Sequence, residues 1–404
     1  MSFRTSLRLA ALCVAAPLIA GAQEHADVTS LGNGARALAL SYATTAVSED
    51  VTAIGWNPAG LTYLKRSEFV FVGRLLIPGT STKVTDLAPA TYPRYSGAGE
   101  ITGAIDPIEF VGVAVPRKIL GRTVTAGIAY RRFTEGVRAG TFETRRAQSN
   151  GRYKGSTLFS STGGVRALSP SLAVEITPSI RLGATANLLS GSSDYTIRGP
   201  YPYTYESRET NYSGLAIETG ALITLREGLR IGVHATLPHD RTLTFDNDTI
   251  SRDVTRRAPL ALAIGMALDV SANARISADL RHAPWSEARY EETTSGDTVG
   301  SPVGVNDANS IHFGYERDIS NEERGAKLRL GAFARRTTAR DLKGKPISAF
   351  GVSGGRSWLF ERVGVDVGMM FARTSRWTRS ENAALRVELA QNDLIVSVGL
   401  RRFF

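Results

Sequence analysis

From about residue 67 to the C-terminus, apolar residues alternate with small, polar or charged residues at a period of two. Between 260 and 270 one face carries Leu260, Leu262, Ile264, Met266, Leu268 and Val270, and the other carries Ala261, Ala263, Gly265, Ala267 and Asp269. The same division recurs at 274–281, 328–335 and 363–371. An apolar face opposite a small or polar face is typical of a transmembrane β-strand between lipid and a wet lumen. A soluble β-sandwich also alternates, but its polar face would carry more Lys, Glu and Thr.

The pattern predicts an all-β transmembrane antiparallel barrel of about fourteen strands, an even number as single-chain bacterial barrels require. The strands are expected at 67–77, 105–117, 121–134, 157–176, 179–198, 208–225, 229–247, 253–270, 274–292, 307–320, 325–338, 346–360, 362–376 and 390–404.

The connections between these strands alternate in length. Short ones are expected at 177–178, 226–228, 271–273 and near Glu361, and long ones rich in Gly, Ser, Thr, Asp and Pro at 78–104, 135–156, 199–207 and 293–306. Short turns belong on the periplasmic side and long loops outside. With both termini periplasmic, this order agrees with an even strand count.

The two ends of the chain indicate export to the outer membrane. Residues 1–22 have a charged start, a short apolar run and a small-residue cleavage site, as in a secretory signal peptide. The only cysteine, Cys13, lies inside it. At the other end, Phe404 closes an alternating strand and resembles the signal read by the barrel assembly machinery. Because no linker interrupts residues 67–404, one continuous barrel domain is expected there.

The net charge of +10 comes almost entirely from arginine. Guanidinium groups bind phosphate bidentately, so surface arginines could hold lipopolysaccharide. Ordinary lumen and loop charge explains the excess equally simply, and we favour that interpretation. The charge is scattered and forms no basic, aromatic-rich patch, which argues against a nucleic-acid partner.

Residues 23–66 do not alternate and are dense in Ala, Gly, Ser and Thr. Small residues allow a backbone to pack closely inside a narrow lumen. Pro58 fixes one backbone dihedral and favours a turn or a helix start, which Asn57 can cap. These features predict an N-terminal plug segment inside the barrel.

The same segment carries a family resemblance. Gly34-Ala35-Arg36-Ala37, then Glu49-Asp50, then Asn57-Pro58-Ala59-Gly60-Leu61 resembles the FadL-type outer-membrane transporter superfamily, which carries hydrophobic compounds such as long-chain fatty acids. PorV-like proteins of type IX secretion share this N-terminal pattern. The chain departs from the family at Ser41, Tyr42 and Thr44, where glycines are usual.

The resemblance implies a passive transporter with an N-terminal hatch and lateral release of a hydrophobic small-molecule ligand into outer-membrane lipid. Asn57, Pro58, Ala59 and Gly60 would shape the hatch, and Arg36 and Asp50 would tie it to lumen charges. The alternation adds lumen-facing candidates for ligand contact or internal salt bridges, namely Arg131, Glu218, Arg275, Asp279, Arg329, Arg335 and Asp366.

Other functions fit less well. No nucleophile elbow or metal-spaced pair surrounds the histidines, so we expect no catalytic site, metal or cofactor. His234 faces the lumen by alternation, where a lone histidine is usually structural. A plug argues against an open porin. The remaining alternative is a PorV-like protein that binds secreted protein partners through its exterior loops.

Overall fold

The computed structural model describes residues 32–404 except for 80, 87–94, 103, 136–137, 149–150, 199–204, 247–250, 295–296, 303–305, 321–324, 341–345, 375–376, 383–384 and 391. The predicted signal peptide, residues 1–22, therefore lies outside the described residues, as does the start of the predicted plug. None of the helices in the described part is long and apolar enough to cross a membrane.

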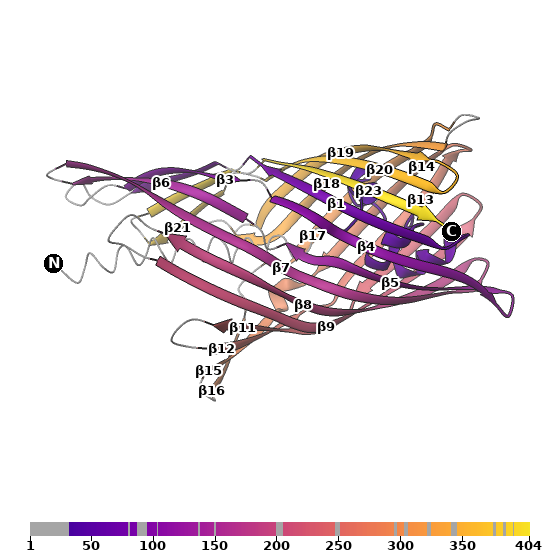
Figure 1. The fold of residues 1–404 in the computed structure, drawn as a ribbon, viewed down its shortest axis with the longest axis horizontal. Helices are drawn as coiled ribbons and strands as arrows, with labels where there is room; N and C mark the ends of the chain where they lie inside the picture. Colours follow the sequence, from indigo (N-terminus) through magenta and orange to yellow (C-terminus); the bar gives the residue numbers. More distant parts are fainter. Residues whose placement is uncertain are drawn as a thin grey trace.

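The described strands form a closed antiparallel barrel of fourteen wall strands (Figure 1). In wall order they are β1 (Glu68–Pro78), β4 (Ala104–Ile119), β5 (Arg122–Glu135), β7 (Gly151–Thr177), β8 (Ile180–Arg198), β9 (Tyr205–Arg226), β10 (Leu229–Thr236), β13 (Ala261–Ser271), β14 (Ala274–Ala283), β17 (Ala308–Asp318), β18 (Gly325–Arg340), β19 (Pro346–Leu359), β20 (Val363–Thr374) and β23 (Asn392–Phe403). The barrel closes where β1 pairs with β23, with Glu68 opposite Phe403. Both the predicted architecture and the predicted count are confirmed.

The alternation correctly predicts which residues face outward from the barrel wall. Leu262, Ile264 and Met266 are exposed on the outer face, whereas Ala263 and Ala267 are buried toward the lumen. Strands whose apolar side chains point outward all around a closed barrel match a lipid-facing belt. The predicted short turns also lie between paired wall strands, for example 227–228 between β9 and β10.

Three predicted strands are wrong in one respect, because each is two strands with a proline at the break. The range 229–247 contains β10 and β11 (His239–Asp246), and 253–270 contains β12 (Ser251–Ala258) and β13. The range 274–292 contains β14, the short helix η3 (Trp285–Glu287) and β15 (Arg289–Thr294). The breaks fall at Pro238, Pro259 and Pro284. Proline cannot donate to the strand ladder, which explains the interruptions.

Several regions expected to be long loops contain strands that extend beyond the wall. They are β2 (Ser81–Asp86), β3 (Tyr95–Thr102), β6 (Arg138–Gln148) and β16 (Asp297–Pro302), joined by β21 (Trp377–Asn382) and β22 (Leu385–Ala390). Gly, Ser and Thr in these stretches suggested loops, but pairing with neighbouring strands, such as β3 with β6, outweighs composition.

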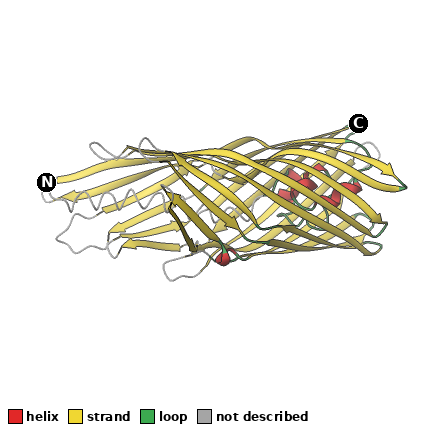
Figure 2. Ribbon diagram, turned by 90° about the horizontal axis from the view of Figure 1, so that it is seen from below, coloured by secondary structure: helices red, strands yellow, loops and turns green. Residues whose placement is uncertain are grey.

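Residues 32–66, called here the lumen segment, lie inside the barrel near the end that holds the C-terminus (Figure 2). The segment contains α2 (Ala35–Ala39), η1 (Val51–Gly55) and η2 (Pro58–Tyr63). Asp50 caps η1 by accepting from the Thr52 amide, and Asn57 caps η2 by accepting from the Ala59 amide, with Pro58 at the first helical position. Helix caps and proline therefore give this small-residue stretch its compact shape.

Candidate lumen site

Asn57 joins the lumen segment to the barrel wall. Its side-chain amide lies 2.8 Å from the Thr45 carbonyl within the segment, 3.1 Å from the Ala221 carbonyl of β9 and 3.3 Å from the Val233 carbonyl of β10. Its oxygen caps η2. The side chain is completely buried, so the loss of these bonds would leave polar groups without water.

The wall facing the segment is lined with glycine. In the described part of the chain, a Cβ on any of eight wall glycines would lie within 3.1 Å of a segment atom: Gly183, Gly220, Gly232, Gly265, Gly314, Gly331, Gly355 and Gly368. They form four directly opposed cross-strand pairs, 183 with 220, 232 with 265, 314 with 331, and 355 with 368. At Gly220 the Cβ would lie 2.0 Å from Asn57 Oδ1. The lumen is therefore filled at this level, not wet as the alternation suggested.

The segment contains a strained turn at the positions where the resembling family has glycines. Ser41 and Tyr42 have φ values of 49° and 67°, a left-handed conformation that costs a residue with a side chain about 1–2 kcal/mol. Contacts with the wall hold it there. His312 Nδ1 lies 2.6 Å from the Ser41 carbonyl, and Arg281 donates to the Tyr42 carbonyl at 2.6 Å. The Tyr42 ring stacks on Trp56 at 5.3 Å.

Arg36 is the charged centre of the segment. It lies 3.6 Å from Glu49, 3.4 Å from Asp50 and 3.4 Å from Glu316 of β17. From the wall, Arg230 and Arg275 reach Glu49 at 2.5 Å and 2.9 Å. Burial alone would raise the pKa of Glu49, but the three arginine charges outweigh it and lower that pKa to about 2.

The pKa of Asp50 moves in the same direction. Burial opposes the shift, but the charges of Arg36 and Arg401 and the hydrogen bonds from Thr52 hold the pKa below its usual range. Both carboxylates are therefore ionised at neutral pH and can hold their cationic partners.

The ion pairs continue around the wall. Arg329 donates to Glu316 at 2.6 Å and lies 3.2 Å from Asp366, and Arg401 lies 2.7 Å from Asp366. On β14, Asp279 accepts from the amides of Thr44 and Thr45 at 2.9 Å each. Arg275, Asp279, Arg329 and Asp366 are thus engaged with the segment or with its ionic partners.

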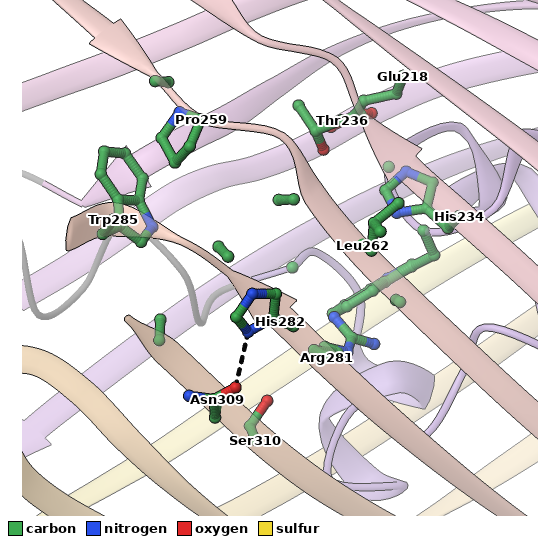
Figure 3. Close-up of a pocket in the computed structure, with 18 of the residues that line it drawn as sticks. Glu218, His234, Thr236, Pro259, Leu262, Arg281, His282, Trp285, Asn309 and Ser310 are labelled. Atoms are coloured by element: carbon green, nitrogen blue, oxygen red, sulfur yellow. Dashed lines mark hydrogen bonds between the residues drawn. The ribbon is translucent and has the colours of Figure 1, made fainter. Parts of the chain in front are cut away.

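A cavity of about 170 Å³ lies next to the lumen segment, at the ends of β10, β13 and β14 (Figure 3). Trp56 and Gly55 of the segment border it. Among its apolar lining residues are Phe133, Leu262 and Trp285. An engineered cavity of about 150 Å³ admits benzene. This cavity can therefore hold one aromatic ring, or the head of an amphiphile and its first methylenes.

Arginine is the main charged residue of the cavity lining, and one of these arginines, Arg281, is paired with Asp279 at 3.1 Å. Five arginines and one carboxylate are among its lining residues, namely Arg131, Arg241, Arg281, Arg335, Arg336 and Glu218. Glu218 is already paired with Arg131 at 2.7 Å. Among the residues that the structure describes, the buried atoms Trp285 Nε1 and Arg281 Nε have no hydrogen-bond partner. Since an unpaired buried donor is costly, the cavity is suited to a ligand that brings an acceptor or a negative charge.

The structure divides the sequence-predicted lumen residues into two groups. Arg131, Glu218 and Arg335 line the cavity, whereas Arg275, Asp279, Arg329 and Asp366 lie among the segment contacts. Sequence reasoning missed Glu316, Arg281 and Trp285. Glu316 and Arg281 could have been found, since both share the lumen face of their strands. His234 is not alone in the lumen, because His239 and His312 line the same cavity.

Comparison with solved structures gives matches over almost the whole chain. A Pseudomonas aeruginosa FadL homologue matches with a TM-score of 0.65 at 11% identity, covering 94% of this chain and 100% of that one.

The chain has the FadL fold.

Two further structures agree with this assignment. The Pseudomonas putida toluene transporter TodX matches with a TM-score of 0.59, and the Ralstonia pickettii toluene transporter TbuX with 0.57. Each is 15% identical and covers 92% of this chain and 99% of its own. No protein-family model and no curated protein sequence matches. A closed barrel with an apolar exterior and the FadL fold is an outer-membrane β-barrel.

Proposed function

We propose that the chain is a passive outer-membrane channel for hydrophobic compounds that carry an anionic head, of which long-chain fatty acids are the simplest case. The observation that carries the proposal is the cavity, where aromatic and aliphatic side chains lie beside five arginines and unpaired donors. A neutral hydrocarbon would leave those donors unsatisfied, whereas a carboxylate accepts from them by charge-assisted bonds.

The lumen segment acts in this proposal as the hatch. It fills the barrel below the cavity and is held to the wall by Asn57 and by the ion pair of Arg36 with Glu316, while Asp50 pairs with Arg36 within the segment. Its left-handed turn at Ser41 and Tyr42 borders both the wall and the cavity residues Trp56 and Arg281. Movement there would connect the cavity to the rest of the lumen.

No energy source is needed for this transfer. Each methylene that leaves water gains on the order of 0.8 kcal/mol. A route from the cavity sideways into lipid spares the acyl chain from crossing the part of the lumen that the segment fills. The solved TodX and TbuX structures are described as toluene transporters, which supports a hydrophobic cargo for the same fold.

The test compares oleate with methyl oleate, which has the same chain without the charge. Purified protein in a non-ionic detergent is titrated with each radiolabelled ligand. Because a hydrogen bond to a charged group contributes about 1.5–3 kcal/mol, oleate should bind about tenfold or more tightly.

Equal affinities would overturn the anionic head, and binding of toluene without oleate would point to a hydrocarbon channel. Absence of binding by all three would overturn the channel itself. Native mass spectrometry of protein from its own membrane then distinguishes a bound small molecule from a co-purifying polypeptide, the sign of a PorV-like role.

A further inference from the structure

The outward side of β17 to β20 carries arginine that no carboxylate of these strands balances. The carboxylates of the four strands share the lumen side by alternation and are Glu316, Asp318 and Asp366. Arg336 of β18 and Arg373 of β20 lie on the opposite, outward side, and both are exposed. This part of the outer surface is therefore cationic by itself.

These two arginines differ from the arginine that faces the lumen beside them. Arg329, on the same strand as Arg336, is held by Glu316 at 2.6 Å and by Asp366 at 3.2 Å. In the part of the chain that the structure describes, Arg336 and Arg373 form no hydrogen bond and no ion pair. A cation beside lipid is costly unless it reaches an anion or water, so the pair is suited to an external anionic group.

Both arginines lie at the outer rim of the apolar belt. Trp358 of β19 marks the periplasmic rim, because tryptophan favours the membrane interface. Ser348, directly opposite Arg336, lies ten residues from Trp358 along β19, and Phe350, directly opposite Arg373, lies eight residues from it. For a strand tilted by about 40° these separations are about 25 Å and 20 Å along the barrel axis. Since the belt is about 25 Å tall, the two long side chains reach the head groups of the outer leaflet.

Aromatic side chains lie next to the arginines on the same outward face. Phe350 is directly opposite Arg373, Phe371 is two residues below it, and both rings are exposed. The wall is also short at this place, because β19 and β20 have 14 and 12 residues whereas β7 and β8 have 27 and 19 (Figure 1). The surface thus combines two cations at head-group level with apolar rings at the level of acyl chains.

We propose that this surface binds lipopolysaccharide, with Arg336 and Arg373 on the phosphates of its lipid A and with Phe350 and Phe371 against its acyl chains. A guanidinium group binds phosphate bidentately. Lipid A carries a phosphate at each end of a disaccharide. The two arginines lie about 12 Å apart, a distance of two strand spacings and two residues, so one lipid can meet both. For these two arginines, phosphate binding replaces ordinary loop charge as the interpretation.

The first test counts lipopolysaccharide on the protein extracted from an outer membrane in a mild non-ionic detergent, by native mass spectrometry. The parent should retain one lipopolysaccharide molecule. Because each lost charge-assisted bond weakens binding about tenfold, R336Q/R373Q should retain it at most about a tenth as often. Unchanged retention by this double variant would overturn the site.

The matched control is R317Q/R356Q, which removes the same charge from the same group of strands. Arg317 and Arg356 are also outward and exposed, and they lie two strands apart on either side of Leu328. They lie at the periplasmic end, where the membrane contains no lipopolysaccharide, so the control should retain as much as the parent. Equal loss in both double variants would mean general attraction by positive charge and would contradict the site.

A second measurement identifies the chemistry that is bound. Purified protein is titrated with lipid A, with lipid A whose phosphates have been removed, and with phosphatidylglycerol. Lipid A should bind about tenfold or more tightly than either of the others. Equal binding of dephosphorylated lipid A or of phosphatidylglycerol would overturn the proposal, as would complete displacement of lipid A by millimolar inorganic phosphate, which would indicate an ordinary phosphate site.

The single variant R373Q separates this site from the proposed function. Arg336 also borders the lumen cavity, whereas Arg373 is not among the residues that line it. R373Q should therefore weaken the binding of lipid A about tenfold and leave the affinity for oleate unchanged. Lipid A binding that R373Q does not weaken would contradict the site. Binding of lipid A by a parent protein that binds no oleate would support the site while the proposed function fails.

Discussion

The lumen segment and the cavity above it are adjacent but built on opposite principles. Below, backbone meets backbone across paired glycines, and Asp279 and Glu316 have partners in the segment. Above, prolines interrupt the wall, and Trp285 and Arg281 keep donors without acceptors. Among the described residues, buried polar atoms without a hydrogen-bond partner occur at both levels, Asp279 Oδ1 below and Trp285 Nε1 above. What separates the two regions is that the chain itself fills the lumen below, whereas a cavity of about 170 Å³ remains above.

The largest effect is expected from filling the glycine face. In G220A/G232A each new Cβ would overlap Asn57 Oδ1 or the Thr45 carbonyl. Overpacking costs about 1–3 kcal/mol per site, so the segment should be displaced about 5-fold to 150-fold more often at each. Ion conductance in planar bilayers should rise accordingly. The control is G354A, whose Cβ would be 3.5 Å from its nearest neighbour and which should conduct like the parent protein. If G220A/G232A also conducted like the parent, the glycine argument would be contradicted.

The next largest effect on conductance is expected from neutralising the charge of Glu49. Its pKa in the seated segment is about 2 against an ordinary 4.5, so its contribution is full above pH 4.5 and is lost as the pH falls toward 2. Conductance should stay low at neutral pH and rise only in that acid window. E49Q should already conduct at pH 7, since bonds to charged groups contribute about 1.5–3 kcal/mol. A rise between pH 7 and 6 in the parent would point to another group.

A smaller change is expected in the cavity. W285F keeps an aromatic ring but removes the unpaired indole donor. Oleate should bind about threefold to tenfold more weakly in equilibrium titrations, the contribution of one hydrogen bond of about 0.5–1.5 kcal/mol. Trp358, on the outer face of β19, provides the control W358F. Weakening by both substitutions alike would mean that the indole of Trp285 has no special role.

The smallest effect concerns the strained turn. S41A and S41G both lose the hydroxyl that contacts Ser353 at 2.8 Å, but only glycine relieves the left-handed backbone. S41G should therefore be about 1 kcal/mol more stable than S41A, with a higher melting temperature in detergent. Equal melting temperatures would show that the turn stores no strain.

The fold was predictable because one face of each strand meets lipid, so every second residue from Leu262 to Met266 had to be apolar. The same parity assigned residues to the lumen face, but it could not show how far along the barrel each of these residues lies. Arg335 lies at the cavity and Arg329 at the segment, six residues apart on β18, and the register that separates them depends on partner strands far away in sequence.

The proline breaks were visible in the sequence but not interpretable there. Pro178 sits in a turn between strands, whereas Pro259 sits inside an alternating run. Strand pairing shows the difference: Leu262 pairs with His282 and Arg257 with Arg289, but the stretch around Pro259 between them is left unpaired. The strain at Ser41 was foreshadowed by its departure from the usual glycine.

The glycine face makes the segment and the barrel a matched pair in evolution and in engineering. A larger residue at Gly232 or Gly368 would survive only if the segment changed shape at Thr45 or Ala35, so the two parts of the gene should vary together. A segment transplanted from another barrel should fail to seat unless the glycines opposite it are transplanted as well. The lumen segment and the wall glycines opposite it should therefore be inherited as one unit.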